Sequence, residues 1–89
     1  MISREILIQN KLGLHARAAS KFVALAKEFS CSVEITSPSA SADGKSIMKV
    51  LLLQATLGTT ITISTDGKDE DAAMSALTEL IDNKFSEEE

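Results

Sequence analysis

The residues best suited to chemistry lie together in the segment Lys11–Ala19, which reads KLGLHARAA. This segment holds the chain's only histidine, His15, with Gly13 two residues before it and Arg17 two residues after it. An apolar series with helical spacing then follows at Ala19, Phe22, Val23, Ala26 and Phe29. The pattern predicts a tight turn at Gly13 and a helix that begins at or just after His15 and ends near Phe29.

The start of this predicted helix is a place where an anion can bind. The first backbone N–H groups of a helix have no partner inside it, and the helix dipole makes that end positive. A phosphate there would meet free donors, and the planar guanidinium of Arg17 suits phosphate oxygens. The same positive field disfavours the imidazolium form of His15, so a ring lone pair stays available for nucleophilic attack. We therefore interpret His15 as a side chain placed to carry a phosphoryl group.

A plainer interpretation of these residues is also open. A single histidine near a helix start can be an ordinary polar cap, and Arg17 can be an ordinary surface charge. The chain would then be a small ligand-sensing or protein-binding module without chemistry of its own. Formation of an acid-labile, base-stable phosphoryl adduct distinguishes the two interpretations.

Composition and charge limit the classes of function that the chain can have. The 89 residues are 44% hydrophobic, with three Phe and no Trp or Tyr, which predicts one domain spanning residues 1–89 with an aliphatic core. The net charge of −4 argues against a nucleic-acid partner. No apolar run is long enough to span a membrane and no signal peptide is recognised, so we expect a cytoplasmic protein.

Cofactor chemistry is not expected. His15 and the single cysteine, Cys31, lie far apart in sequence and do not suggest a metal-ligand set. There is no Gly-rich nucleotide loop of the Walker or Rossmann type, so any phosphoryl group must come from a partner. Cys31 cannot form an internal disulfide, which fits a reducing compartment, and we expect it to pack as a small buried residue.

Four segments have strand patterns: Met1–Gln9, Cys31–Ser37, a short edge strand within Ser39–Ala42, and Thr59–Thr65. The apolar residues that share a face within them are Ile2, Ile6 and Ile8, then Val33 and Ile35, then Ile61 and Ile63. Such alternation is typical of strands with one buried face. Pro38 and the small residues after it favour a turn and an edge position.

A second helix is predicted in the apolar run that follows Ser46, a suitable N-cap residue. On a helix, Val50, Leu53 and Leu57 share the side expected to face the core. The residues on the other side are Ile47, Met48, Leu51, Leu52 and Ala55. Exposed apolar residues on a small domain indicate a partner surface. A strand with Lys49 inside it, or a helix buried all round, remains an alternative on pattern alone.

A third helix follows the turn at Asp66-Gly67, with Asp69, Glu70 and Asp71 supplying negative charge to its first turn. Its predicted apolar face consists of Ala73, Leu77, Leu80 and Ile81, with Met74 at the margin. The acidic tail, Phe85 to Glu89, is expected to fray. The resulting order, βαββαβα, predicts an α+β fold: an open-faced β-sandwich in which a four-stranded antiparallel sheet carries three helices on one face.

Two motifs now identify a resemblance. Gly13-Leu14-His15-Ala16-Arg17, followed by Gly44-Lys45-Ser46-Ile47-Met48, resembles HPr, the histidine phosphocarrier family of the phosphoenolpyruvate-dependent phosphotransferase system. The resemblance covers nearly the whole chain. The segments Asn10-Lys11-Leu12-Gly13 and Asn83-Lys84-Phe85 are similar to the nitrogen-related NPr branch, so both a sugar-transport and a regulatory output stay open.

The resemblance implies a phosphocarrier and not an enzyme. His15 would accept phosphate at Nδ1 from phospho-Enzyme I and pass it to a histidine of a IIA protein, with Arg17 neutralising the phosphate. Ser46 matches the position that an HPr kinase/phosphorylase modifies in some members. The implied docking surface consists of Ala16, Ser20, Ile47, Met48, Leu51 and Leu52. We expect a monomer. Many members have proline where this chain has Ala18, which leaves the first helical turn less preset.

Overall fold

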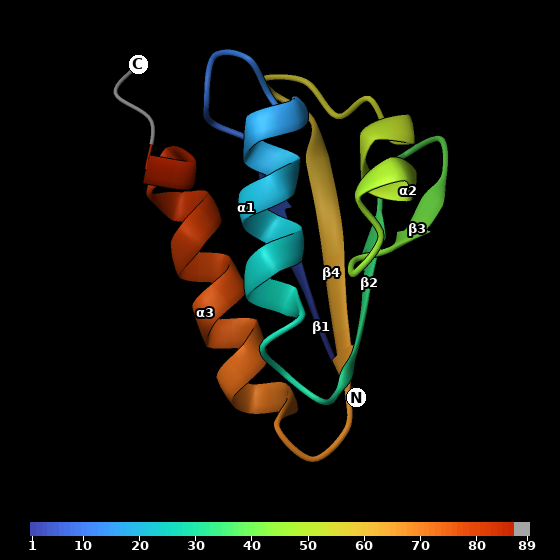
Figure 1. Cartoon of the computed structure of the whole chain (residues 1–89). Helices are drawn as coiled ribbons and strands as arrows, with labels where there is room; N and C mark the ends of the chain where they lie inside the picture. The colour runs from blue at the N-terminus through green and yellow to red at the C-terminus, as the bar shows by residue number, and fades with distance from the viewer. Residues whose placement is uncertain (87–89) are drawn as a thin grey trace.

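The computed structural model describes residues 1–86, which form seven regular elements and a final 3₁₀ turn (Figure 1). In chain order these are β1 (Ile2–Leu7), α1 (Ala16–Ala26), β2 (Ser32–Thr36), β3 (Ser41–Asp43), α2 (Ile47–Leu52), β4 (Thr60–Asp66), α3 (Glu70–Asp82) and the turn Lys84–Ser86. The predicted order βαββαβα is therefore confirmed, and the run after Ser46 forms the predicted helix, α2.

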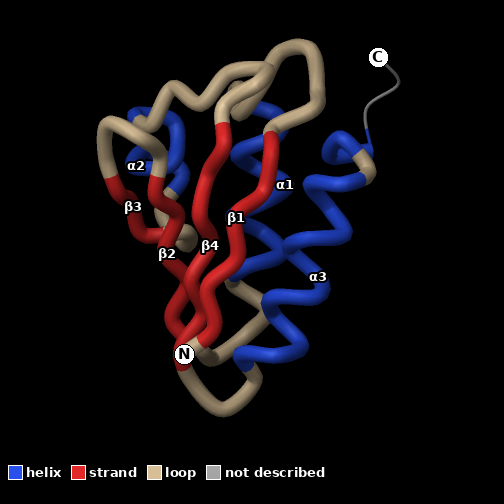
Figure 2. The backbone as a smooth tube through the Cα atoms, turned by 180° about the vertical axis from the view of Figure 1, so that it is seen from behind, coloured by secondary structure: helices blue, strands red, loops and turns tan. Residues whose placement is uncertain are grey.

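The four strands form one antiparallel sheet in the order β1-β4-β2-β3. The register pairs Ile6 with Ile61 and Ile35 with Ile63, so the inward residues of neighbouring strands meet on one face. The three helices cover that face and leave the other bare, as the view from behind shows (Figure 2). This is the predicted open-faced sandwich, with β3 as the predicted short edge strand.

The core lies between the sheet and the helices. Fully buried apolar residues from every layer meet there: Ile35, Ile61, Ile63, Phe22, Val50, Leu77 and Ile81. They arise from period-2 alternation in the strands and from one apolar face of each helix. Cys31 is buried as predicted, and burial raises the pKa of its thiol. In the residues that the structure describes, no helix is long and apolar enough to cross a membrane.

Two helices are shorter than predicted. α1 ends at Ala26 instead of near Phe29, and α2 ends at Leu52. After α2 the chain enters a left-handed conformation at Gln54, with φ of 52°, so helical spacing no longer applies to the residues beyond it. Ala55 is therefore buried and Leu57 is 57% exposed, the reverse of the predicted assignment.

The C-terminal end departs from prediction in two places. Met74 is buried in the core and not marginal. Phe85, predicted to belong to a frayed tail, is completely buried. Its carbonyl accepts a hydrogen bond of 2.6 Å from Nζ of Lys21, which ties the 3₁₀ turn Lys84–Ser86 to α1. The rest of the predicted acidic tail, residues 87–89, lies outside the described residues.

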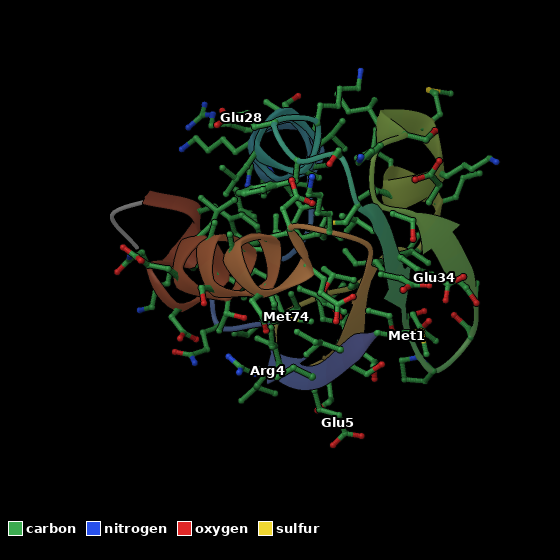
Figure 3. The ribbon with its side chains drawn as sticks, turned by 90° about the horizontal axis from the view of Figure 1, so that it is seen from below. Met1, Arg4, Glu5, Glu28, Glu34 and Met74 are labelled. Atoms are coloured by element: carbon green, nitrogen blue, oxygen red, sulfur yellow. The ribbon has the colours of Figure 1, made fainter. Side chains whose placement is uncertain are left out.

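The bare face of the sheet is mostly polar, with Leu7 as an exposed apolar residue at the end of β1. The hydroxyls of Ser3 on β1 and Ser64 on β4 share a hydrogen bond of 2.9 Å across it. Glu34 on β2 is paired with Ser64 and lies on the same face. Glu5 on β1 points away from the helices (Figure 3). This face of the sheet thus carries hydroxyl and carboxylate groups, whereas the face under the helices carries isoleucines.

Candidate functional site

The site is built at one end of the molecule, where two loops lie side by side. The β1–α1 loop and the α2–β4 loop meet near the start of α1 (Figure 1). The backbone N–H of Leu14 donates to the carbonyl of Ala55 at 2.8 Å, and the N–H of Ile8 donates to Thr59 at 2.9 Å. These bonds bring the segment that leads to His15 close to the segment that leaves α2.

Gly13 is required by this close approach. Its φ is +67°, in the left-handed region where only glycine is free of strain. A Cβ at this position would lie 2.5 Å from the carbonyl oxygen of Ala55 and 2.7 Å from Cα of Thr56. Any side chain would push the two loops apart. The predicted tight turn at Gly13 is thus confirmed, with a packing reason that the sequence did not reveal.

His15 is the N-cap residue of α1, as predicted. Its backbone is extended, with φ of −81° and ψ of −178°, and its carbonyl accepts the first helical bond from Ala19 at 2.8 Å. The N–H groups of Ala16, Arg17 and Ala18 precede that bond and lie outside the helical ladder. His15 is half-buried. The residue predicted to carry chemistry therefore stands beside the positive end of a helix and remains accessible.

The charge around this helix start is positive. Arg17 is exposed in the first turn of α1, and that turn contains no acidic residue. Lys11 is exposed in the preceding loop. An anionic group on the His15 ring would meet this field without a neighbouring first-turn carboxylate to oppose it.

Ser46 is the N-cap residue of α2, also as predicted. Its N–H donates to the carbonyl of Asp43 at 3.1 Å, while its hydroxyl makes no capping bond to the helix. The neighbouring Lys45 is held elsewhere, because its Nζ donates to the carbonyl of Phe29 at 2.7 Å. The side chain of Ser46 is half-buried next to the apolar residues that open α2.

Three apolar side chains of α2 face solvent and are called the α2 patch below: Ile47, Met48 and Leu52, with exposures of 37%, 69% and 73%. Leu51, predicted to join them, is half-buried and packs against the core. Ala16 and Ser20 are exposed on α1, the helix that packs beside α2. The structure thus places five of the six predicted docking residues on the surface.

Sequence reasoning missed further exposed apolar residues. Leu7, Leu12 and Leu57 are 48%, 64% and 57% exposed. Leu7 ends β1, Leu12 lies in the β1–α1 loop, and Leu57 lies in the α2–β4 loop, so all three lie at the end of the molecule that carries His15. A leucine next to a glycine in a loop is the available signal, and both Leu12 and Leu57 have one.

No metal site is formed by the part of the chain that the structure describes, because no three His, Cys, Asp or Glu side chains gather within reach of one ion.

Comparison with known proteins gives consistent matches. A family model described as "PTS HPr component phosphorylation site" matches residues 2–83. The phosphocarrier protein HPr of Pseudomonas aeruginosa is 51% identical over 90 residues, with the whole of both chains covered. The phosphocarrier protein NPr of Shewanella violacea is 43% identical over 86 residues, which cover 97% of this chain and 94% of that protein.

Solved structures match the fold as closely. The crystal structure of HPr-C-His from Thermoanaerobacter tengcongensis has a TM-score of 0.95 and 39% identity over the whole of both chains. A crystal structure described as an HPr dimer from the same organism has a TM-score of 0.78 and 39% identity, covering 98% of this chain and 100% of that one. Likeness of this extent shows common family as well as common fold.

Proposed function

The chain belongs to the HPr family of phosphocarrier proteins, and on that premise we propose that His15 accepts a phosphoryl group from phospho-Enzyme I and passes it to a histidine of a IIA protein. The observation that supports this most strongly is the position of His15. It caps α1, is half-buried, and stands beside three amides that the helical ladder leaves out.

The transfer is an exchange between two imidazoles. Nδ1 of neutral His15 attacks the phosphorus of the donor phosphohistidine, and a new N–P bond forms as the donor's N–P bond breaks. The donor imidazole leaves with the electron pair of the broken bond. The His15 ring gives up its N–H proton as the N–P bond forms, and the released donor ring takes up one proton, so no net proton is consumed. The second transfer, to the IIA histidine, repeats these events with His15 as the leaving group.

The helix start and Arg17 supply the electrostatics. A phosphoryl dianion on His15 is stabilised by the amides at the start of α1 and by the guanidinium of Arg17. Stabilisation of the charge that is shared between two rings during transfer speeds both steps, since it acts where the charge develops. The partial exposure of His15 lets two different partners reach the same ring in turn.

Docking is assigned to the α2 patch together with Ala16 and Ser20. An apolar centre surrounded by polar groups is the usual anatomy of a protein interface. Enzyme I and the IIA protein would use the same surface in succession, because each must bring its own histidine to His15. The net positive surroundings of His15 suit partners with acidic surfaces.

Ser46 is proposed as a regulatory position. A phosphoryl group there would add about −1.5 to −2 charge next to Ile47 and Met48, inside the proposed docking surface. An HPr kinase/phosphorylase is the enzyme class that the family resemblance suggests for this step. The two similar proteins named HPr and NPr leave transport and nitrogen regulation as alternative outputs.

We further propose a cytoplasmic carrier that acts as a monomer. The buried free thiol of Cys31 suits a reducing compartment. Sedimentation equilibrium over a concentration series tests the oligomeric state, and a stable dimer at micromolar concentration would contradict the proposal.

Phosphoryl labelling tests the main proposal directly. The protein is incubated with phosphoenolpyruvate and Enzyme I, and an acid-labile, base-stable adduct is expected. His15→Ala should lose the adduct and keep the melting temperature of the parent. Undiminished labelling of the variant would overturn the assignment. Absence of any label on the folded parent would favour a binding module without chemistry.

A further inference from the structure

Asn10 is a buried polar residue in the β1–α1 loop, which leads to His15. Its side chain is 1% exposed, and in residues 1–86 the buried polar residues are Asn10, Ser37 and Thr65. Burying a carboxamide is unfavourable unless it forms hydrogen bonds. The placement of Asn10 therefore calls for a specific bonding role.

That role is visible at Gly13. Nδ2 of Asn10 donates to the carbonyl of Gly13 at 2.6 Å, and the N–H of Gly13 donates back to the carbonyl of Asn10 at 3.1 Å. The carboxamide nitrogen must face the Gly13 oxygen, since two oxygens could not bond. Asn10 and Gly13 are thus joined by two hydrogen bonds of opposite direction, which close the four-residue turn between them.

The same peptide group is held from its other end. The carbonyl of Gly13 and the N–H of Leu14 belong to one planar peptide unit. Asn10 holds its oxygen, and the carbonyl of Ala55 holds its N–H at 2.8 Å. Leu14 is buried, so the side chain that follows is fixed as well. His15 is the next residue.

We propose that Asn10 is a positioning residue for His15, acting through the Gly13–Leu14 peptide group. This inference rests on the proposed function. With both ends of that peptide bonded, its plane has one orientation, and the backbone of His15 enters α1 at a fixed angle. Loss of the Asn10 carboxamide leaves the buried Gly13 carbonyl unpaired and frees the peptide to rotate.

The expected consequence is a slower transfer and not simply a less stable protein. Displacing a reacting group by a fraction of its bond-forming distance lowers rates steeply. The docking partner must also align its own histidine with the His15 ring, and the β1–α1 loop sets where that ring lies. A residue with only a structural role would lower stability without altering the rate of the folded protein.

The test compares Asn10→Ala with Thr65→Val. Thr65 is equally buried, and its Oγ1 donates to the carbonyl of Glu70 at 3.0 Å, at the opposite end of the sheet. Asn10→Ala and Thr65→Val each remove one hydrogen bond from a buried side chain to a backbone carbonyl. A third variant, Asn10→Asp, keeps the volume but replaces the donor with an acceptor. Initial rates of His15 phosphorylation by Enzyme I are measured where each variant is fully folded, together with hydrogen exchange at the Leu14 amide.

Asn10→Ala and Asn10→Asp should each accept phosphate at least about tenfold more slowly than the parent and exchange the Leu14 amide faster. Thr65→Val should stay within about twofold of the parental rate. A parental rate in either folded Asn10 variant overturns the inference, and so does equal slowing in Thr65→Val. A parent protein that Enzyme I does not label would instead contradict the proposed function. In that case the positioning role is judged from hydrogen exchange alone, and an unchanged exchange rate of the Leu14 amide in the Asn10 variants would overturn it.

Discussion

The carboxylate of Asp69 accepts a hydrogen bond from the backbone N–H of Cys31 at 2.9 Å, joining residues 38 positions apart. Its other oxygen accepts the N–H of Ser30, also at 2.9 Å. Asp69 is the N-cap residue of α3, so this one side chain fastens the start of α3 to the loop between α1 and β2. Hydrogen bonding from the Ser30 amide, and then from Cys31, lowers the pKa of the Asp69 carboxyl.

Asp69→Asn is expected to lower stability in a pH-dependent way. A carboxyl whose pKa is lower in the folded state adds stability above its unfolded pKa of about 3.9, and this stability is lost as pH falls through the folded pKa. The difference in urea midpoint between parent and variant should be largest near pH 7 and shrink below about pH 4. Asp71→Asn is the control, because it removes a charge from the same helical turn without touching Ser30 or Cys31. A difference that is constant across this pH range would contradict the prediction.

Gln54→Gly is expected to stabilise the protein by about 0.5–1 kcal/mol. The left-handed conformation at Gln54 costs an L-residue about 1–2 kcal/mol, whereas glycine loses about 0.5–1 kcal/mol more chain entropy on folding. Chemical denaturation of parent, Gln54→Gly and Gln54→Ala provides the measurement. The alanine variant keeps the strained φ and should show no such gain, so equal stabilisation by both changes would refute this explanation.

Arg17→Ala is expected to leave a protein that is still phosphorylated on His15 but at least about tenfold slower. The guanidinium stabilises charge during transfer and forms no bond to phosphorus. Arg17→Lys should recover only part of the rate, because an ammonium lacks the planar fork. Quenched-flow rates of phosphoryl acceptance decide the point, and a normal rate in Arg17→Ala would exclude the proposed role.

Met48→Glu is expected to weaken binding to Enzyme I and to the IIA acceptor by at least about tenfold, since it puts charge in the centre of an apolar surface. Stability should change by about 0.5 kcal/mol or less, because Met48 faces solvent. Leu53→Ala is the matched control, with the opposite expected effects on docking and stability. Leu53 is buried nearby, so this change should cost about 2–5 kcal/mol and leave docking intact. Calorimetric titration and thermal melts separate the two effects.

Ser46→Asp is expected to slow phosphoryl acceptance by His15 at low salt while leaving stability within about 1 kcal/mol of the parent. The added charge would have to be desolvated at the docking surface and would repel an acidic partner. Rates are compared at low and high salt, because screening should narrow the difference if repulsion is the cause. Equal rates at low salt would leave Ser46 as a helix cap.

Much of the fold follows from short-range patterns. Ile61 and Ile63 alternate with polar residues, and this is the spacing expected of a strand with one buried face. The helix after His15 was predictable because its apolar spacing begins directly at a polar residue that follows a glycine. In a regular strand or helix, burial of one face appears in the sequence as a regular spacing of apolar residues, and these elements are regular.

The errors occur where regularity ends. Helical spacing predicts the wrong burial for Ala55 and Leu57, because α2 ends at Leu52 and the chain turns left-handed at Gln54. Glutamine gives no signal of a left-handed turn. Phe85 is buried by contacts with elements far away in sequence, which no local pattern records. The site of Asn10 shows the same limit, because its own partner, Gly13, is local, whereas the carbonyl of Ala55 that holds the other end of the same peptide comes from the α2–β4 loop.

The uncovered face of the sheet lies away from the residues that we propose to carry the phosphoryl group and to dock its partners. Glu5 is exposed there and points away from the helices (Figure 3), while Cys31 is buried with a raised thiol pKa and is poorly placed to react with a label. Glu5→Cys would therefore provide a single addressable handle. Molecules anchored to a sensor chip through that handle would all present His15 outward in one orientation, so the arrival of each partner could be followed in real time on a uniform layer.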